Sequence, residues 1–190
     1  MTDVKLQINQ ILAGSRKAFQ VFVDEYKRLV SHVVFRMVPN SADQEDVCQE
    51  VFLKIYQNLT GFRSESKIST WVAAVAYNTC LNHLEKKRIP LLDDLLPEEK
   101  SVDSIPDCAV GPDKLIEERE TSSILQAQIG RIPVRFRTIL TLYHLEGMSY
   151  KEIGEITGLP EGTVKSYLFR ARRLLKDRLM AKYQPEDLWH

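Results

Sequence analysis

Cysteines are few and long hydrophobic runs are absent in this sequence of 190 residues. The three cysteines, Cys48, Cys80 and Cys108, are an odd number at no recurring spacing, which argues against a disulfide framework or a zinc module. We expect all three to be reduced. No run approaches the roughly eighteen apolar residues of a membrane span. The opening stretch MTDVKLQINQILAG has acids and amides where a signal peptide would be apolar, so we predict a cytoplasmic protein without membrane insertion.

Signatures of catalysis are missing as well. The sequence has no glycine-rich phosphate loop, no metal-ligand set and no nucleophile in a recognisable setting. Cys80 and His83 lie one helical turn apart, but two side chains fall short of the usual three or four metal ligands, so we interpret them as buried helix residues. The sequence therefore predicts neither an enzyme nor a bound cofactor or metal.

The net charge is zero, yet the charges are segregated along the chain. Residues 1–90 carry 12 Lys and Arg against 9 Asp and Glu, residues 91–120 carry 3 against 10, and residues 121–190 carry 11 against 7. The acidic middle has four prolines between residues 90 and 112 and little helical periodicity, as is typical of a linker. We therefore expect two domains, residues 1–89 and 113–184, joined by an acidic flexible linker over residues 90–112.

Both basic blocks are predicted to be helical, because strand signals are nearly absent and apolar residues recur with a period of about 3.6. The expected fold class is all-α, with two small helical domains. In the first block, Ser15 caps a helix that ends before Pro39, a second helix runs from near Ser41 to Gly61, and a third begins near Ser69. Their predicted apolar faces contain Phe19, Phe22, Val23, Tyr26, Val30, Val33 and Val34, then Val47, Val51, Phe52, Ile55, Tyr56 and Leu59, and finally Trp71, Val75 and Leu81. We interpret Trp71 as a core residue.

The second block ends in a pattern typical of a helix-turn-helix. One helix is predicted around Leu115, Ile124, Leu125 and Ile129, and the run VRFRTILTLYHLEG predicts another. Ser149 and Glu152 then form a capping box, Gly158-Leu159-Pro160 breaks the chain, and a long helix runs over residues 161–182.

The long last helix carries an apolar stripe on one face and positive charge on another. In a helix-turn-helix, residues near the start of the second helix enter the major groove, and later basic residues contact phosphate. The residues predicted to contact DNA are Thr163, Lys165, Ser166, Tyr167, Phe169, Arg170 and Arg173. A solvated basic face on a C-terminal helix is the alternative interpretation.

The run IPVRFRTILTLYHLEGMSYKEIGEITGLPEGTVKSYLFRARRLLKDRL resembles region 4 of the extracytoplasmic-function (group IV) sigma factors of bacterial RNA polymerase. The first block resembles region 2 of the same family through DQEDVCQEVFLKIYQNLTGFR, the loop SESKIS and TWVAAVAYNTCLNHLEKKR, in that order. The resemblance implies that region 2 binds core RNA polymerase and reads and opens the minus-ten element of promoter DNA. Region 4 would read the minus-thirty-five element. It also implies an anti-sigma factor as a partner, and we expect two loosely joined domains that such a partner can clasp.

The resemblance assigns two sets of residues in region 2. Asp46, Gln49 and Glu50 lie at positions i, i+3 and i+4 of one helix face, and the family uses the matching positions to bind polymerase. Compensation of the helix dipole is the alternative interpretation of these acids. The second set would hold an extruded minus-ten base and the nearby backbone, and it consists of Arg63, Ser64, Glu65, Ser66, Lys67, Asn78, Asn82, Lys86, Lys87 and Arg88.

Two positions depart from the residues that are common in this family. Gly154 stands where alanine is common, at a cost of roughly 1 kcal/mol in helix propensity unless close packing requires glycine. Tyr167 stands where arginine is common, which puts one DNA contact in doubt. A stand-alone helix-turn-helix repressor or activator is the alternative function.

Overall fold

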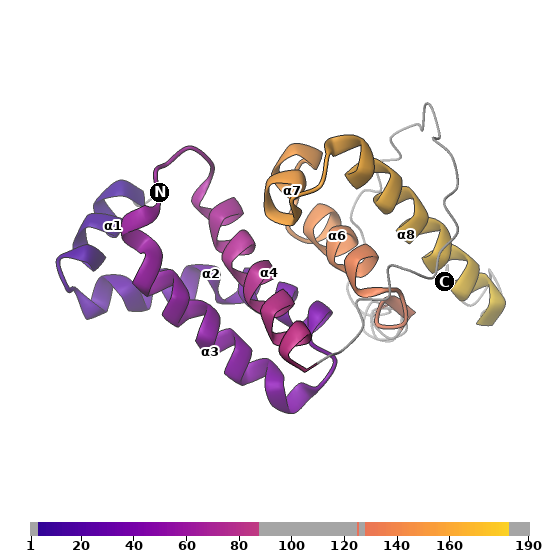
Figure 1. Cartoon of the computed structure of the whole chain (residues 1–190), viewed down its shortest axis with the longest axis horizontal. Helices are drawn as coiled ribbons and strands as arrows, with labels where there is room; N and C mark the ends of the chain where they lie inside the picture. Colours follow the sequence, from indigo (N-terminus) through magenta and orange to yellow (C-terminus); the bar gives the residue numbers. More distant parts are fainter. Residues whose placement is uncertain (1–3, 88–124, 126–127, 183–190) are drawn as a thin grey trace, which may run out of the picture.

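The structure, a computed structural model, describes residues 4–87, 125 and 128–182, and within these ranges every regular element is helical (Figure 1). The N-terminal part contains α1 (Val4–Leu12), α2 (Arg16–Met37), α3 (Ser41–Asn58), the short 3-10 helix η1 (Leu59–Gly61) and α4 (Ile68–Lys86). The C-terminal part contains α6 (Val134–His144), α7 (Tyr150–Thr157) and α8 (Glu161–Lys182). The prediction of an all-α fold is confirmed.

The N-terminal domain is built around α2 and α4, which pack against each other and against α3. Local signals set the ends of these helices as predicted. The Ser15 side chain accepts a hydrogen bond from the backbone N–H of Ala18 at the start of α2, and Asn40 does the same for Ala42 at the start of α3. Helix α1 was not predicted from the sequence, although its buried Ile8 and Ile11 are one turn apart on the face that packs on α2.

Two predicted apolar faces need correction. Tyr56 is 48% exposed rather than buried, and its ring lies edge-on to Phe19 with centroids 5.0 Å apart. Trp71, Val75 and Leu81 are only partly buried. The residues that α4 buries are instead Ile68, Thr70, Val72, Ala73, Ala76, Tyr77, Thr79, Cys80 and Leu84. Helix α4 buries more of its surface than the sequence predicted because α2, α3 and α7 all pack on it. Its small Ala and Cys side chains let these helices approach closely.

The C-terminal domain is a helix-turn-helix of α7 and α8 supported by α6. Gly158 ends α7 with φ of 72°, the left-handed conformation that favours glycine, and its N–H donates to the carbonyl of Gly154. A Cβ on Gly154 would lie 2.8 Å from the carbonyl oxygen of Leu159. Close approach of the turn to α7 therefore explains glycine at residue 154.

Several expectations fall on residues outside the described ranges. These are the linker, Cys108, Arg88 and the predicted helix positions Leu115 and Ile124. Among the described residues, Cys48 and Cys80 are free, and burial raises the pKa of the Cys80 thiol to about 12. The same part of the chain holds no cluster of three or more His, Cys, Asp or Glu side chains that could bind a metal. No helix in it is both long and apolar enough to cross a membrane.

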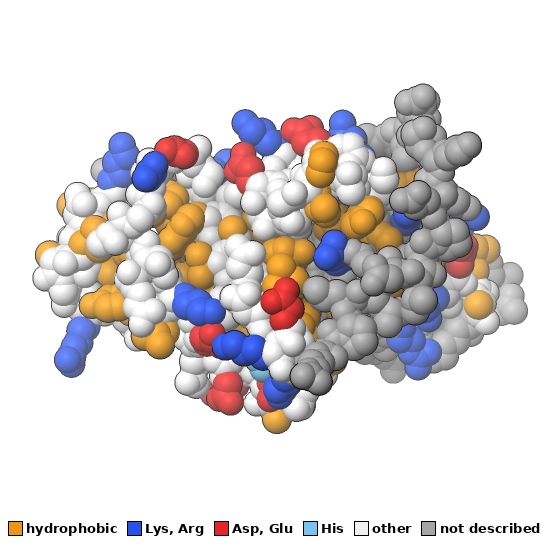
Figure 2. All heavy atoms as spheres, viewed as in Figure 1, with side chains coloured by type: hydrophobic (Ala, Val, Ile, Leu, Met, Phe, Trp, Pro, Cys, Tyr) orange, Lys and Arg blue, Asp and Glu red, His pale blue; other side chains and the backbone are white. Residues whose placement is uncertain are grey.

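The two domains pack directly on each other, with α2 beside α6 and α4 beside α7 (Figure 1). Figure 2 shows one face of the whole molecule. Hydrophobic side chains gather in the middle of that face, and acidic and basic side chains surround them. Polar contacts across the boundary include an ion pair between Lys67 and Glu152 and a hydrogen bond of 2.5 Å between His32 Nδ1 and Glu146 Oε1. The expectation of loosely joined domains is therefore wrong for this structure.

Glu152 makes the capping box of α7 a testable source of stability. Its carboxylate accepts hydrogen bonds from the backbone N–H and the hydroxyl of Ser149, 2.8 and 2.7 Å away. These bonds, with that of Lys67, lower the pKa of Glu152 to about 2. We expect Glu152→Ala to reduce the free energy of unfolding by about 1–2 kcal/mol at pH 7. Because the pKa is depressed, this difference should be complete above the ordinary value of 4.5 and disappear as the pH falls toward about 2.

Urea unfolding of parent and variant between pH 7 and pH 2.5 measures this difference in free energy. Glu155→Ala on the same helix is the matched control, since Glu155 is exposed and lies outside the capping box. A gap between parent and Glu152→Ala that stays constant over this pH range would contradict the assignment.

Candidate nucleic-acid interface

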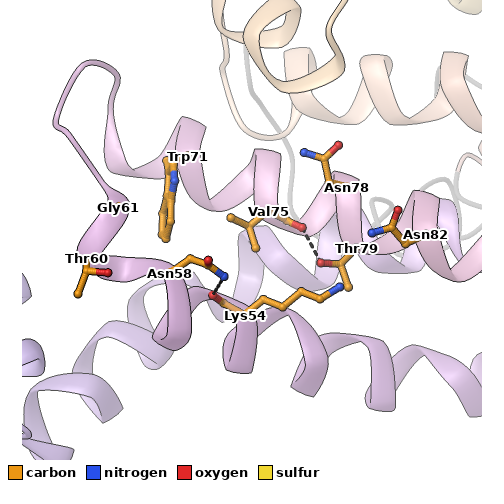
Figure 3. Close-up of a pocket in the computed structure, with 9 residues that line it drawn as sticks. All are labelled: Lys54, Asn58, Thr60, Gly61, Trp71, Val75, Asn78, Thr79 and Asn82. Carbon is orange, nitrogen blue, oxygen red and sulfur yellow. Dashed lines mark hydrogen bonds between the residues drawn. The ribbon is translucent and has the colours of Figure 1, made fainter.

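A cavity of about 480 Å³ opens between α3, η1 and α4 in the N-terminal domain (Figure 3). Its size is within the range of sites that hold small molecules. Nine residues line it: Lys54, Asn58, Thr60, Gly61, Trp71, Val75, Asn78, Thr79 and Asn82. The lining thus combines one aromatic ring with amides, hydroxyls and one ammonium group.

Trp71 forms the apolar wall of this cavity. Its indole reaches from α4 toward α3 (Figure 3), and its other contacts include Phe62, with ring centroids 5.5 Å apart. The interpretation of Trp71 as a core residue was thus incomplete, because the ring both packs against the core and borders the cavity. An indole held in this way offers a flat surface on which a nucleobase can stack.

Asn78 is exposed on the rim of the cavity, and its side chain points away from α3 (Figure 3). An amide presents two donors and an acceptor, the groups that read a base edge. Two other polar groups of the lining are already used, since the Thr79 hydroxyl donates to the carbonyl of Val75 and the Asn58 amide donates to that of Lys54. Asn78 is therefore freer than Thr79 or Asn58 to form hydrogen bonds with a ligand.

The structure divides the predicted minus-ten residues into separate groups. Asn78 and Asn82 line the cavity, but the loop residues Arg63, Ser64, Glu65, Ser66 and Lys67 do not. Within the loop, Ser64 has φ of 58°, which is uncommon for a residue other than glycine, and Lys67 pairs with Glu152 at 2.9 Å. Lys86 and Lys87 are exposed at the end of α4, where Lys87 pairs with Asp43 at 2.5 Å and lowers the pKa of that carboxyl.

The contribution of α3 to the cavity was not predicted from the sequence. Lys54 and Asn58 are one helical turn apart, so the helical period places them on one face. Only the packing of α3 against α4 brings that face to Asn78. The missed signal was a pair of polar residues at i, i+4 near the end of a helix.

The predicted polymerase-binding residues lie on one side of α3. Asp46 and Gln49 are exposed, and Glu50 is partly exposed and pairs with Lys54 at 2.8 Å, which lowers the pKa of the Glu50 carboxyl. One turn further on, Leu53 is 57% exposed and continues the same helical face. The face therefore offers both negative charge and an apolar contact, a combination that suits a basic partner helix.

The second helix of the helix-turn-helix, α8, packs through Val164, Leu168 and Ala171 and turns other residues outward. Of the predicted DNA contacts, Lys165, Ser166 and Arg173 are exposed, whereas Thr163, Tyr167, Phe169 and Arg170 are partly buried. Lys165 lies over the ring of Tyr150, 5.3 Å from its centroid. The ring of Tyr167 lies edge-on to that of Phe136 with centroids 5.0 Å apart. Tyr167 therefore packs α8 against α6, whether or not it also contacts DNA.

Comparison with known proteins identifies the class to which this arrangement belongs. Residues 22–89 match Sigma-70 region 2, and residues 122–175 match Sigma-70, region 4. The solved structure of CnrH in complex with the cytosolic domain of CnrY shares the fold. It has a TM-score of 0.66 and 18% identity, over 94% of this chain and 97% of that one.

Curated relatives narrow the class further. The ECF RNA polymerase sigma factor SigW of Bacillus subtilis is 32% identical over 93% of this chain and 96% of its own length. The ECF RNA polymerase sigma-E factor of Escherichia coli K12 is 35% identical over 94% of this chain and 95% of its own length. The chain belongs to the family of ECF RNA polymerase sigma factors, as its sequence motifs predicted.

Proposed function

We propose that this chain binds core RNA polymerase through the exposed face of α3, opens the minus-ten element at the cavity between α3 and α4, and contacts the minus-thirty-five element through α8. The observation that carries this proposal is the pairing of two different DNA-binding geometries in one chain. A cavity with an aromatic wall and an exposed amide suits an unpaired base, whereas a basic second helix of a helix-turn-helix suits a duplex groove.

In this proposal, the functions divide between the two domains that the sequence predicts. Residues 1–89 form region 2, residues 113–184 form region 4, and residues 90–112 link them. The function is non-catalytic and uses no cofactor, because the chemistry of RNA synthesis belongs to the polymerase. We place the protein in the cytoplasm, where polymerase and promoter DNA occur.

An anti-sigma factor is a further proposed partner. The relatives of this chain include RpoE of Bartonella quintana, whose structure was solved in complex with the anti-sigma factor NepR and matches with a TM-score of 0.63 and 20% identity. That likeness supports a shared fold. The proposal for this chain rests in addition on its family membership and on the exposed acidic and apolar face of α3.

Promoter opening in the presence and absence of core polymerase tests the proposed function. We expect permanganate to modify minus-ten thymines only when the chain and core polymerase are both present. A stand-alone repressor or activator would bind its DNA site tightly as a purified protein. Tight, sequence-specific binding without core polymerase, combined with no opening in its presence, would contradict the proposal.

Lys165 provides a test of the region 4 contact. Its ammonium is exposed near the start of α8, where a helix-turn-helix approaches the phosphates. Because each phosphate contact releases about one counterion, Lys165→Ala should reduce by about one the slope of log affinity against log salt. Filter binding of the polymerase complex to promoter DNA from about 50 to about 300 mM salt measures this slope, since each contact changes affinity roughly fivefold over that range.

Lys27→Ala is the matched control for this measurement, since Lys27 is an exposed lysine in the other domain that pairs with Asp24. It removes the same charge without touching α8, and we expect the parent slope. Equal slopes for Lys165→Ala and the parent would place Lys165 away from the phosphates.

A further inference from the structure

Two tyrosines of the C-terminal domain stack on each other where α6, α7 and α8 meet. Tyr143 is the penultimate residue of α6, and Tyr150 is the first residue of α7. Their ring centroids are 5.2 Å apart and the ring planes differ by 16°, which is the geometry of stacked rings. We refer to Tyr143 and Tyr150 as the tyrosine pair. The sequence predicted no role in DNA binding for either residue.

Each ring of the tyrosine pair lies under one cation of α8. The Lys165 ammonium lies over the ring of Tyr150, 5.3 Å from its centroid, and the Arg172 guanidinium lies over the ring of Tyr143 at 5.2 Å. Both distances fall within the roughly 6 Å over which an aromatic face attracts a cation. Lys165 and Arg172 are seven residues apart, so two helical turns place them on the same side of α8. The tyrosine pair therefore contacts one side of α8 at two points.

Arg172 is held by a second side chain of α6 in addition to Tyr143. Its Nε donates a hydrogen bond of 3.2 Å to His144 Nε2, and the His144 ring lies edge-on to that of Tyr143 with centroids 5.0 Å apart. Tyr143 in turn stacks on Tyr150. The position of the Tyr150 ring is therefore set by α6 and α8 as well as by its own helix.

Lys165 is the more exposed of the two cations, since Arg172 is partly buried. An ammonium carries three N–H donors, so attraction to a ring face leaves donors for a phosphate oxygen. A lysine side chain loses rotamer freedom when it binds a phosphate, and one that a ring already holds has less freedom to lose. A ring that orders Lys165 in the free chain therefore strengthens the contact of this lysine with DNA.

We propose that Tyr150 is a positioning residue for promoter DNA, whose ring holds the Lys165 ammonium where α8 meets a phosphate. This inference rests on the proposed function, because it refines the contact of α8 with the minus-thirty-five element. Tyr150 acts through Lys165, and only the ring of Tyr150 is needed for this role. In a direct contact of Tyr150 with DNA, by contrast, the hydroxyl would donate to a phosphate oxygen.

The variants Tyr150→Leu and Tyr150→Phe test this role as a pair. Leucine keeps apolar packing against the core at this partly buried position, but it has no aromatic face for a cation. Phenylalanine keeps the ring and removes only the hydroxyl. Both variants leave the capping box of Ser149 with Glu152 intact, so we expect α7 to form in each of them.

NMR of the full chain without DNA is the first measurement. Protons above the face of an aromatic ring are shielded by its ring current, so the methylene protons next to the Lys165 ammonium should resonate upfield of those of exposed lysines. Tyr150→Phe should preserve this shift and Tyr150→Leu should abolish it. Lys165→Arg identifies the signal by its disappearance. An unshifted Lys165 signal in the parent, or the same upfield shift in Tyr150→Leu, would overturn the pairing of Lys165 with the ring.

Affinity of the polymerase complex for promoter DNA is the second measurement. A cation over a ring at an exposed site changes an equilibrium constant by roughly two- to fivefold, so Tyr150→Leu should weaken DNA binding by about that factor. Tyr150→Phe should bind as the parent does. When Lys165→Ala is already present, Tyr150→Leu should cause no further loss, because the side chain that the ring positions is gone.

Two results of this double-variant comparison would overturn the positioning role. Equal losses for Tyr150→Leu and Tyr150→Phe would show that the hydroxyl itself contacts DNA. An equal loss for Tyr150→Leu with and without Lys165 would show that Tyr150 acts independently of this lysine. Failure of the parent complex to bind promoter DNA would refute the proposed function and with it the role of Tyr150, whereas the NMR shift of Lys165 would remain.

Discussion

Asn78→Ala should slow promoter opening and relax discrimination at one minus-ten position. The Asn78 amide is exposed on the rim of a cavity that the Trp71 indole borders. We therefore expect this amide to form hydrogen bonds with a base that only a melted strand can present. Loss of one such contact is worth about 1–3 kcal/mol, or roughly a 5- to 150-fold drop in the equilibrium between closed and open complexes. Binding of the closed duplex complex should barely change.

Permanganate footprinting with single-base variants of the minus-ten element measures both effects. Gln57→Ala is the matched control, because Gln57 is an exposed amide on α3 that does not line the cavity. The control should open every variant as the parent does. If Asn78→Ala shows the parent's rate and the parent's sequence preference, the extruded base is read elsewhere.

Charge reversal on α3, in the variant Asp46→Lys/Glu50→Lys, should disrupt assembly with core polymerase. Truncating one partner of an interfacial charge pair costs about 2–5 kcal/mol, and reversal adds repulsion, so we expect affinity to fall at least 30-fold. The fold should survive, since the buried Val47, Val51 and Ile55 lie on another face of the helix. Reversal also ends the pairing of Glu50 with Lys54.

Fluorescence titration of core polymerase measures this affinity, and circular dichroism checks the fold. Asp24→Lys/Glu25→Lys on α2 is the matched control, because both residues are exposed. The ion pair of Asp24 with Lys27 lies on the surface and contributes little to the stability of the fold. The α3 assignment fails if the two double variants bind polymerase with equal affinity.

Elements with local causes could be predicted from the sequence. The cap at Ser15, the capping box of Ser149 with Glu152 and the stop at Gly158 were all found where expected. Each depends on hydrogen bonds or dihedral angles within about four residues, so the sequence pattern contains the whole cause. Family membership could be predicted for a related reason, because two motif sets in a fixed order carry more information than either alone.

Predictions failed where the cause was not local. The helical period gave α4 an apolar face at Trp71, Val75 and Leu81, but the helix is covered on several sides and buries its small residues instead. In the same way, Tyr56 is in register with buried positions and yet is 48% exposed. A period tells which residues share a face of a helix, and only the neighbouring helices decide which face is covered.

The sequence by itself determined the helices, their caps, the division into regions 2 and 4, and the positions of Asn78 and Glu50 on their helices. The tertiary structure alone decided that Lys54 and Asn58 share a cavity with Asn78, and that His32 meets Glu146 across 114 residues of chain. Bonds within a helix follow from spacing along the sequence. Contacts between helices depend instead on how whole surfaces pack, which no short pattern specifies.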